Sequence, residues 1–365
     1  MITTFHDFSR LGTSKQFDNH DQNDIIAINK LLSSLTSEAS AKAKRNSCPI
    51  CGKDCTSFCS SHSVPRFVLH NIAENGCVSY ALKYELPSFA KDPGIKKAGV
   101  FHLICNDCDN TKFQEYEDPS SYANPPTDKM LAQIALKDNL LMLSKRYIEK
   151  ELYTILAQQH PLLKSFALEK KFIGSQDIIE YEDNLRYALK SISSKFGDSY
   201  YLCYHRRLDY VVPYAAQAVI AMVSDFDDKV INDVFDFSPN TKTQYLHVAI
   251  FPMETSSIIL LFVKNGETKY RKFYRQLKKL SLDDQLAAIN YIIFAYTENV
   301  YLNPKLQASL KKDKNFNEIC CQTQDVSFES PLFLQDPLAT TIEKNSLSHR
   351  HSIPNLLSKT YALKI

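Results

Sequence analysis

CPICGKDCTSFCSSHSVPRF (48–67) and FHLICNDCDNTKFQEYE (101–117) are the two stretches that decide how this chain folds. Each contains a Cys-x-x-Cys pair, Cys48/Cys51 in the first and Cys105/Cys108 in the second. One such pair supplies two thiolates to one side of a tetrahedral Zn²⁺, so the two pairs complete a four-sulfur site. A module this small buries too little apolar surface to fold alone, and the sequence therefore predicts a structural zinc ion.

The composition is that of a globular protein in a reducing compartment. The chain has 365 residues, of which 44% are hydrophobic and 23% are charged. The formal net charge of +2 does not indicate nucleic-acid binding by bulk electrostatics. Ten cysteines without a secretory leader favour metal binding over disulfides and predict a cytoplasmic protein. No apolar stretch has the length of a membrane span, so no membrane partner is expected.

The pattern along the chain predicts an α+β fold in four parts. An N-terminal arm and helix (1–45) precede a small, treble-clef-like zinc module of ββα type (46–122). Helices and an antiparallel sheet follow as a C-terminal domain (123–327), and the weakly periodic end of the chain (328–365) is predicted to be a tail.

Individual elements can also be predicted. Helices are expected at about 21–45, 106–116, 128–159, 176–195 and 282–296, with a short one after Pro304. Strands are expected at 58–64 and 100–104 in the zinc module, and Gly52 is expected to take a positive φ in the first cysteine turn. From Tyr200 the apolar period changes to two, and the runs YYLCYHRR, YVVPYAAQAVIAMVSDF, TQYLHVAIFPM and SSIILLFVKNGETKYRKF predict one antiparallel sheet. Asn265-Gly266 is expected to close its last hairpin.

The order of the zinc-module motifs resembles the zinc-stabilised form of the HNH, or His-Me finger, nuclease module. A cysteine turn is followed by Ser-His-x-x-Pro and then by a strand that leads into ICNDCDNTKF. The resemblance implies that His62 is the general base that activates water. It places Asp109 at the position of a histidine that binds a divalent ion, Mg²⁺ or Mn²⁺. It also places Asn110 and Lys112 on a helix that faces nucleic acid, and Arg66 is suited to contact phosphate.

A wider set of motifs is similar to a group of bacterial proteins that carry an HNH-like label. The matching segments are SHSVPRFVL (61–69), LICNDCDNTKFQEYE (103–117) and FAYTENVYLNPKL (294–306). In this group the position of Asp109 is regularly acidic, and Tyr116 and Glu117 belong to the pattern. The resemblance suggests a role in defence or in mobile-element biology.

Ser61 departs from the nuclease pattern, because it stands where the family has a metal-binding acid. A divalent ion would then depend on Asp109, with His102, Asp107 or Glu117 as the further ligand. His62 has a competing role as a residue that supports the zinc site by a hydrogen bond to a thiolate or a carbonyl.

Cys55 and Cys59 leave further alternatives open. With His62 they have a spacing that can hold a metal, they can be buried as small apolar side chains, or they can form a redox sensor.

The sequence thus leads to one hypothesis and one alternative. The hypothesis is an HNH-like endonuclease that hydrolyses phosphodiester bonds with a divalent metal, on DNA rather than RNA. The alternative is a non-catalytic zinc-stabilised module that binds nucleic acid or protein and has a degenerate nuclease centre. In either case the C-terminal domain is expected to supply target recognition or a surface for a protein partner.

Overall fold

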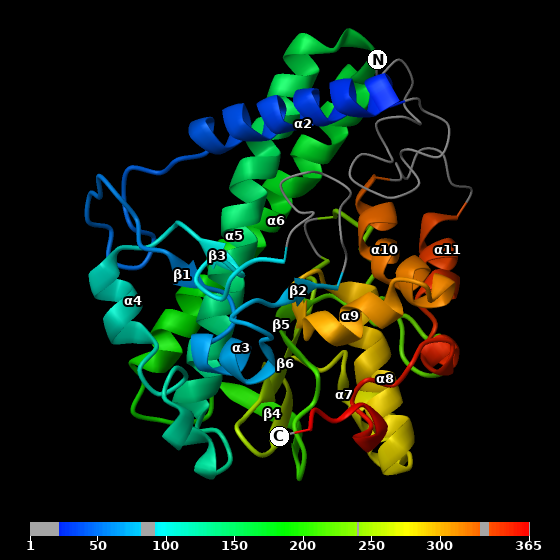
Figure 1. Ribbon diagram of the computed structural model, residues 1–365. Coiled ribbons are helices and arrows are strands. Elements are labelled where there is room, and N and C mark those ends of the chain that lie inside the picture. Colours follow the sequence, from blue (N-terminus) through cyan, green and yellow to red (C-terminus); the bar gives the residue numbers. More distant parts are fainter. Residues whose placement is uncertain (1–21, 82–91, 239–240, 329–335, 365) are drawn as a thin grey trace.

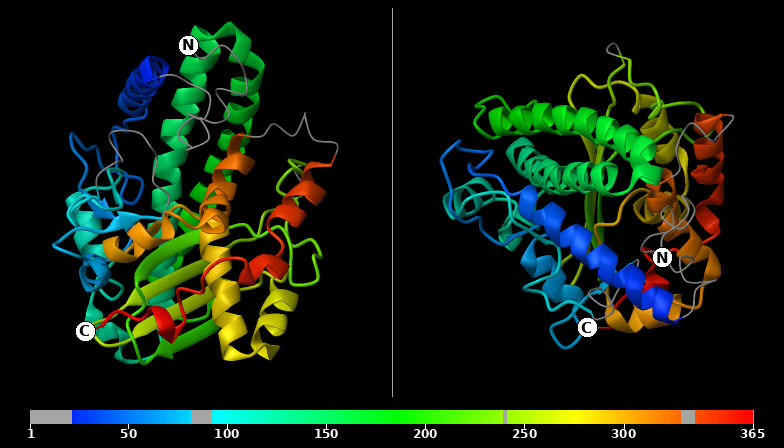
Figure 2. Two further views of the ribbon diagram at one scale, coloured as in Figure 1. Left: turned by 45° about the vertical axis from the view of Figure 1, so that its right-hand side comes forward. Right: turned by 90° about the horizontal axis from the view of Figure 1, so that it is seen from above.

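The computed structural model describes residues 22–81, 92–238, 241–328 and 336–364. Its centre is a six-stranded sheet in the order β2-β8-β5-β6-β7-β4, in which every pair of neighbours is antiparallel. Helices cover both faces of this sheet (Figures 1 and 2). The predicted mixture of helices with an antiparallel sheet is confirmed, whereas the predicted N-terminal arm lies outside the described residues.

The strands of the large sheet are β2 (Ser79–Tyr80), β4 (Tyr200–Leu208), β5 (Tyr214–Ile220), β6 (Leu246–Pro252), β7 (Ser257–Lys264) and β8 (Val300–Leu302). A second sheet pairs β1 (Ser61–His62) with β3 (Val100–Phe101). The helices are α2 (Gln22–Lys42), α3 (Arg66–Ile72), α4 (Asn106–Lys112), α5 (Asp128–Gln159), α6 (Lys164–Ile192), α7 (Arg271–Lys279), α8 (Leu282–Tyr296), α9 (Pro304–Leu310), α10 (Lys314–Phe328) and α11 (Pro337–Lys344).

The α5–α6 hairpin and the cysteine-containing region share one core with the first face of the sheet. Helix α5 begins where the Thr127 side chain accepts a hydrogen bond from the Met130 amide, and it ends before Pro161, as predicted. Helix α6 starts at Lys164, twelve residues before the expected 176. Leu163 and Phe166 are buried in a contact with α2, which lies across the hairpin (Figure 1).

Helices α7, α8 and α10 belong to the core on the second face. Helix α8 begins at a Ser281 cap, as predicted. The segment 328–365 is predicted from the sequence to be a tail. Its described part instead packs against this core, where Leu347, Leu356 and Leu357 are buried. Leu347 begins one short 3₁₀ turn, and Leu356 and Leu357 lie between that turn and the next, so the three have no helical or strand period that the sequence could reveal.

The last predicted hairpin is wrong. Asn265-Gly266 does form a turn, with Gly266 at φ +89°, but the chain continues into helix α7 instead of a returning strand. Phe273 and Leu277 are four residues apart and both fully buried, which is a helical spacing. Burial of this pair against the sheet favours the helix more than the alternation of apolar and polar residues in KYRKF favours a strand.

The zinc-module region and the C-terminal half form one continuous structure. Strand β2 follows α3 and pairs with β8, so that Ser79 lies opposite Leu302. The Asn303 side chain donates a hydrogen bond to the Ile72 carbonyl at the end of α3. In the part of the chain that the structure describes, no helix combines the length and the apolar character needed to cross a membrane.

Candidate functional site

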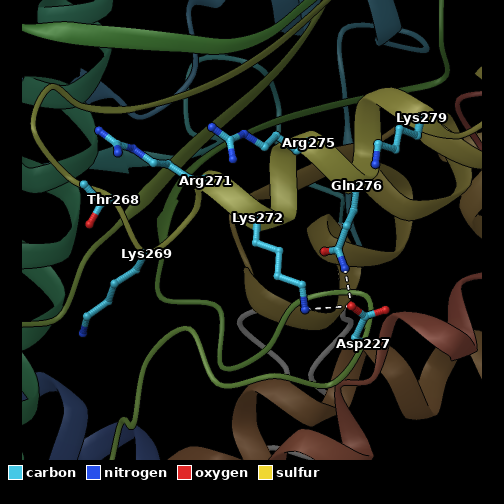
Figure 3. Close-up of a pocket in the computed structure, with 8 residues that line it drawn as sticks. All are labelled: Asp227, Thr268, Lys269, Arg271, Lys272, Arg275, Gln276 and Lys279. Atoms are coloured by element: carbon cyan, nitrogen blue, oxygen red, sulfur yellow. Dashed lines mark hydrogen bonds and ion pairs between the residues drawn. The ribbon is translucent and has the colours of Figure 1, made fainter.

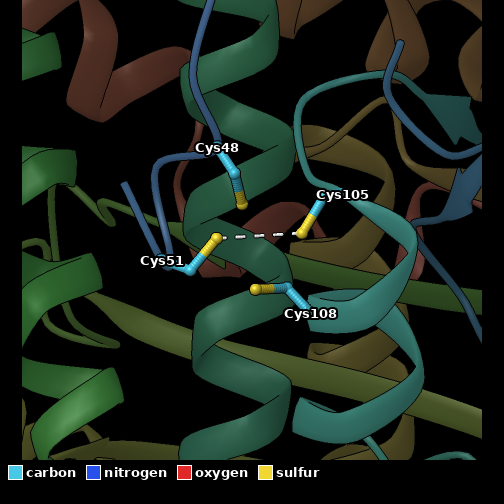
Figure 4. A group of neighbouring side chains, drawn as sticks. All are labelled: Cys48, Cys51, Cys105 and Cys108. Carbon is cyan, nitrogen blue, oxygen red and sulfur yellow. Dashed lines mark hydrogen bonds between the residues drawn. The ribbon is translucent and has the colours of Figure 1, made fainter. Parts of the chain in front are cut away.

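Four cysteines converge between the end of α2 and the start of α4 (Figure 4). The sulfur atoms of Cys48, Cys51, Cys105 and Cys108 all lie within 4.8 Å of one another, and the Cys51 and Cys105 sulfurs are 3.8 Å apart. A tetrahedral Zn²⁺ with Zn–S bonds of about 2.3 Å has sulfur–sulfur edges of about 3.8 Å. The two predicted pairs therefore form a site that can hold one metal ion, and its size suits zinc.

The backbone of the first pair explains why these residues form the site. The Gly52 amide donates to the Cys48 carbonyl and the Cys48 amide donates to the Lys53 carbonyl, which folds the segment into a tight turn. Gly52 has a φ of +70°, a conformation that side chains with a Cβ rarely adopt, so the expected positive φ is confirmed. The second pair begins α4, where the Asp109 amide bonds the Cys105 carbonyl.

The thiols differ in acidity because their surroundings differ. A hydrogen bond from the Lys53 amide lowers the pKa of Cys51 to about 7, whereas burial raises the pKa of Cys105 and Cys108. A metal binds the thiolate form of cysteine. Binding must therefore displace protons from Cys105 and Cys108, the thiols whose pKa is raised. Affinity for the metal should therefore decrease as the pH falls.

Cys55 and Cys59 lie outside this site. The Cys55 sulfur faces the Lys53 carbonyl at 3.4 Å, and Cys59 is buried, with its pKa raised to about 12 by burial and by the nearby Asp109. Among the described residues, the group of histidine, cysteine and acidic side chains close enough to hold a metal is the four-cysteine cluster. The structure thus does not bring Cys55, Cys59 and His62 together as a second ligand set.

A fully buried lysine of α5 binds residues close to the four-cysteine cluster. The Lys137 ammonium donates to Ser61 Oγ at 2.9 Å, to Asp109 Oδ1 at 3.0 Å and to Glu117 Oε1 at 3.1 Å. Ser61 Oγ also donates to Asp109 Oδ1 at 2.7 Å. The side chain of Lys137 is 0% exposed, and its ammonium lies 3.6 Å from the centre of the Phe113 ring. Two acidic groups and one aromatic face thus surround a cation that water does not reach.

Lys137 is the residue that sequence reasoning missed, although the sequence carries a signal for it. Met130, Ile134 and Leu141 form the apolar stripe of α5, and position 137 falls on that stripe at helical spacing. A lysine on the buried face of a helix is rare unless a partner compensates its charge. That partner comes from β1 and α4, which the period of α5 cannot indicate.

His62 contacts a different part of the molecule from its neighbour Ser61. Its Nε2 lies 3.1 Å from the Ile95 carbonyl, and since a carbonyl only accepts, Nε2 carries the hydrogen. In the neutral ring the lone pair is then on Nδ1. Burial lowers the pKa of His62, and the nearby Arg66 and Lys137 cations lower it further. The ring is therefore neutral at pH 7.

The three predicted nucleic-acid contacts lie on two helices. Arg66 begins α3 and is exposed, while Asn110 and Lys112 lie on α4, exposed and half-buried respectively. Among the described residues, none of the three side chains has a hydrogen-bond or ion-pair partner. They are therefore free to contact a ligand.

Of the three residues considered as further ligands, only Glu117 reaches the Asp109 cluster. His102 Nδ1 lies 3.1 Å from the Cys59 carbonyl, which fixes its ring in the module. Asp107 is exposed in the first turn of α4. Glu117 contacts Lys137 instead of standing as an open ligand beside Asp109.

The separate motifs of the sequence meet in space. Ser63 of SHSVPRFVL donates to Asn299 Oδ1 at 2.8 Å, and Tyr301 donates to the same atom. A Cβ on Gly99 would lie 2.3 Å from the Tyr301 hydroxyl, so only glycine fits beside this contact. The FAYTENVYLNPKL segment therefore holds the residue that follows β1, although more than 230 residues separate the two.

A second buried network connects α5 and the segment that follows α4 to the sheet. Tyr116 donates to Gln217, Gln217 donates to Asp138, and Asp138 lies 2.7 Å from His247 Nδ1. All four side chains are buried, so the network fixes the module to β5 and β6 and cannot contact a substrate.

Comparison with protein-family models, with curated proteins and with solved structures finds no match to this chain. The assignment of a function therefore depends on the geometry described above.

Proposed function

We propose that this protein is a zinc-stabilised nucleic-acid-binding protein with a treble-clef-like module whose nuclease-like centre is closed by a lysine. The resemblance to HNH modules places Ser61 and Asp109 at the two positions that hold the divalent ion. Both residues bind the Lys137 ammonium, at 2.9 and 3.0 Å. The single observation that supports the proposal is thus a buried ammonium bound to the two residues that the resemblance assigns to a divalent ion.

The buried Lys137 cation suits this group of residues to stabilising the fold more than to catalysing hydrolysis. A catalytic metal must contact a phosphate oxygen, which requires an open coordination position. Lys137 is 0% exposed and so cannot reach a substrate. A divalent ion would need both to displace this ammonium from Asp109 and to find a second hard ligand in place of Ser61.

One observation favours the nuclease as a second candidate. A general base needs a neutral ring with a free lone pair, and it needs a partner that fixes the ring. His62 meets both conditions, because Ile95 fixes Nε2 and burial lowers its pKa. If His62 is the base, its neutral form predominates above pH 6.5, so titration of this group should not change the cleavage rate between pH 7 and 8.

Binding and cleavage of a labelled DNA duplex separate the two candidates. With Mg²⁺ or Mn²⁺ we expect the parent to bind the duplex without cutting it. Arg66→Ala and Lys112→Ala should each weaken binding and reduce the slope of log K against log salt by about 0.9 if they contact phosphates. Fluorescence anisotropy at several salt concentrations measures the binding, and gel electrophoresis of the duplex detects cleavage.

Lys190→Ala is the matched control, since Lys190 is an exposed lysine on α6. Cleavage by the parent that is lost in His62→Ala, with binding retained, would establish the nuclease instead. Equal weakening by Lys190→Ala and Arg66→Ala would contradict a binding role for the module.

A further inference from the structure

Helix α7 carries a row of cations on the face that points away from the sheet. Its Phe273 and Leu277 are fully buried, which directs the opposite side toward solvent. Arg271, Arg275 and Lys279 are all exposed, and each is four residues from the next. A rise of 1.5 Å per residue separates successive members by about 6 Å along the helix. The three charges therefore form one line of about 12 Å along the helix axis.

These three cations have no acidic partner among the residues that the structure describes. Their neighbour Lys272 pairs with Asp225 at 3.0 Å and with Asp227 at 2.7 Å. By contrast, Arg271, Arg275 and Lys279 have no ion pair or side-chain hydrogen bond within the described ranges.

The same residues border a hollow on the surface (Figure 3). Five of its lining residues are lysine or arginine, and Asp227 is the one acid among them. Since Lys272 is already paired with Asp227, the hollow has a strong excess of positive charge.

The stability of the helix accounts for Lys279, which lies in the last turn, but not for Arg271 in the first turn. A cation in the first turn of a helix is unfavourable, because the amino end of the helix dipole is itself positive. Arg271 occupies that position, and no acidic residue lies in the first turn to offset it. A ligand with negative charge would relieve the repulsion among the unpaired cations.

Two tyrosines lie on the flank of the same helix. The rings of Tyr201, on the edge strand β4, and Tyr274, on α7, have their centres 5.4 Å apart. Tyr201 is 43% exposed, and the Lys278 ammonium lies 5.6 Å from the centre of the Tyr274 ring. Exposed aromatic rings beside a row of cations are the combination with which proteins bind single-stranded nucleic acid.

We propose that α7 and Tyr201 form a binding surface for single-stranded nucleic acid. Arg271, Arg275 and Lys279 contact successive phosphates, and the tyrosine pair stacks on an unpaired base. A membrane surface fits less well, because the apolar side chains of α7 are buried in the core and cannot enter a lipid layer. This surface lies across the sheet from the zinc module, so it does not depend on the function proposed for that module.

Anisotropy with a fluorescent 20-nucleotide single strand tests the proposal. The triple variant Arg271→Gln/Arg275→Gln/Lys279→Gln removes three charges and keeps good helix formers on an exposed face. We expect at least tenfold weaker binding at 0.15 M salt and a salt slope reduced by about 2, from about 0.7 for each lost phosphate contact. Tyr201→Ala should weaken binding of the single strand by at least threefold and leave binding of the matched duplex unchanged.

The control variant Lys190→Gln/Lys195→Gln/Lys312→Gln removes the same number of exposed charges from other elements. Circular dichroism of both triple variants establishes that they remain folded. An equal loss of binding in the control variant would overturn the proposal. A loss of duplex binding or of phosphatidylserine-vesicle binding in the α7 variant that exceeds its loss of single-strand binding would also overturn it. A parent that does not bind the single strand at micromolar concentration would also overturn it. If the α7 variant loses binding of the single strand and Arg66→Ala retains it, the binding surface is distinguished from the zinc module.

Discussion

Replacing Cys105 by serine is expected to release the metal and to unfold the region that contains β1, β3 and α4. This region has two strands of two residues each and one helix of seven, so its own hydrogen bonds stabilise it little. Structural zinc contributes about 10 kcal/mol or more to the folding of small zinc modules. We expect the parent to contain one zinc ion per chain and the variant none. Metal analysis and hydrogen exchange of residues 46–122 measure the two effects.

Cys55→Ser is the matched control for this prediction. Cys55 lies in the same turn-rich segment and is half-buried, but its sulfur is outside the four-cysteine cluster. The control should keep its zinc and its slow hydrogen exchange. Loss of zinc in Cys55→Ser, or retention of zinc and protection in Cys105→Ser, would contradict the assigned ligand set. A chelator should remove zinc faster at pH 5 than at pH 7.5, because protons compete with the zinc ion for cysteines such as Cys108, whose pKa is raised.

The second large effect is expected from Lys137→Met, which should destabilise the protein by about 3 kcal/mol. The substitution leaves Asp109, Glu117 and Ser61 without the ammonium that all three bind. Asp109 is largely buried, with 21% of its side chain exposed, so water only partly replaces the lost interaction. The free energy of unfolding in urea, measured with zinc held in excess, gives the change.

Two further variants make this measurement specific. Lys145 lies on the same helix, and its contact with Glu298 is longer, at 3.4 Å, and more exposed. Lys145→Met should therefore lower the free energy of unfolding by less than about 1 kcal/mol. The double variant Lys137→Met/Asp109→Asn should be more stable than the sum of its single variants predicts, since it removes both charges of one pair. Equal costs for Lys137→Met and Lys145→Met would show that the buried ion pair does not stabilise the fold.

Local pattern was sufficient for several elements. The apolar stripe and the flanking Thr127 and Pro161 define α5, and the Ser281 cap defines the start of α8. For both helices the signals lie within the helix or directly beside it. Tertiary packing overrode the local pattern at KYRKF, where burial of Phe273 and Leu277 made a helix of a predicted strand.

The sequence by itself predicted the four-cysteine cluster, because two Cys-x-x-Cys turns can supply four thiolates and the spacing within each turn is local. It also predicted β4, β5, β6 and β7 as strands of one antiparallel sheet, but not β8 and β2, which extend that sheet beyond β5. Only the tertiary structure decided what lies beside the metal: Lys137 is 76 residues from Ser61 and 28 from Asp109, and it meets them because α5 packs against the module. The same packing commits the Asp109 and Glu117 carboxylates to a buried ammonium, so neither stands as an open ligand for a divalent ion.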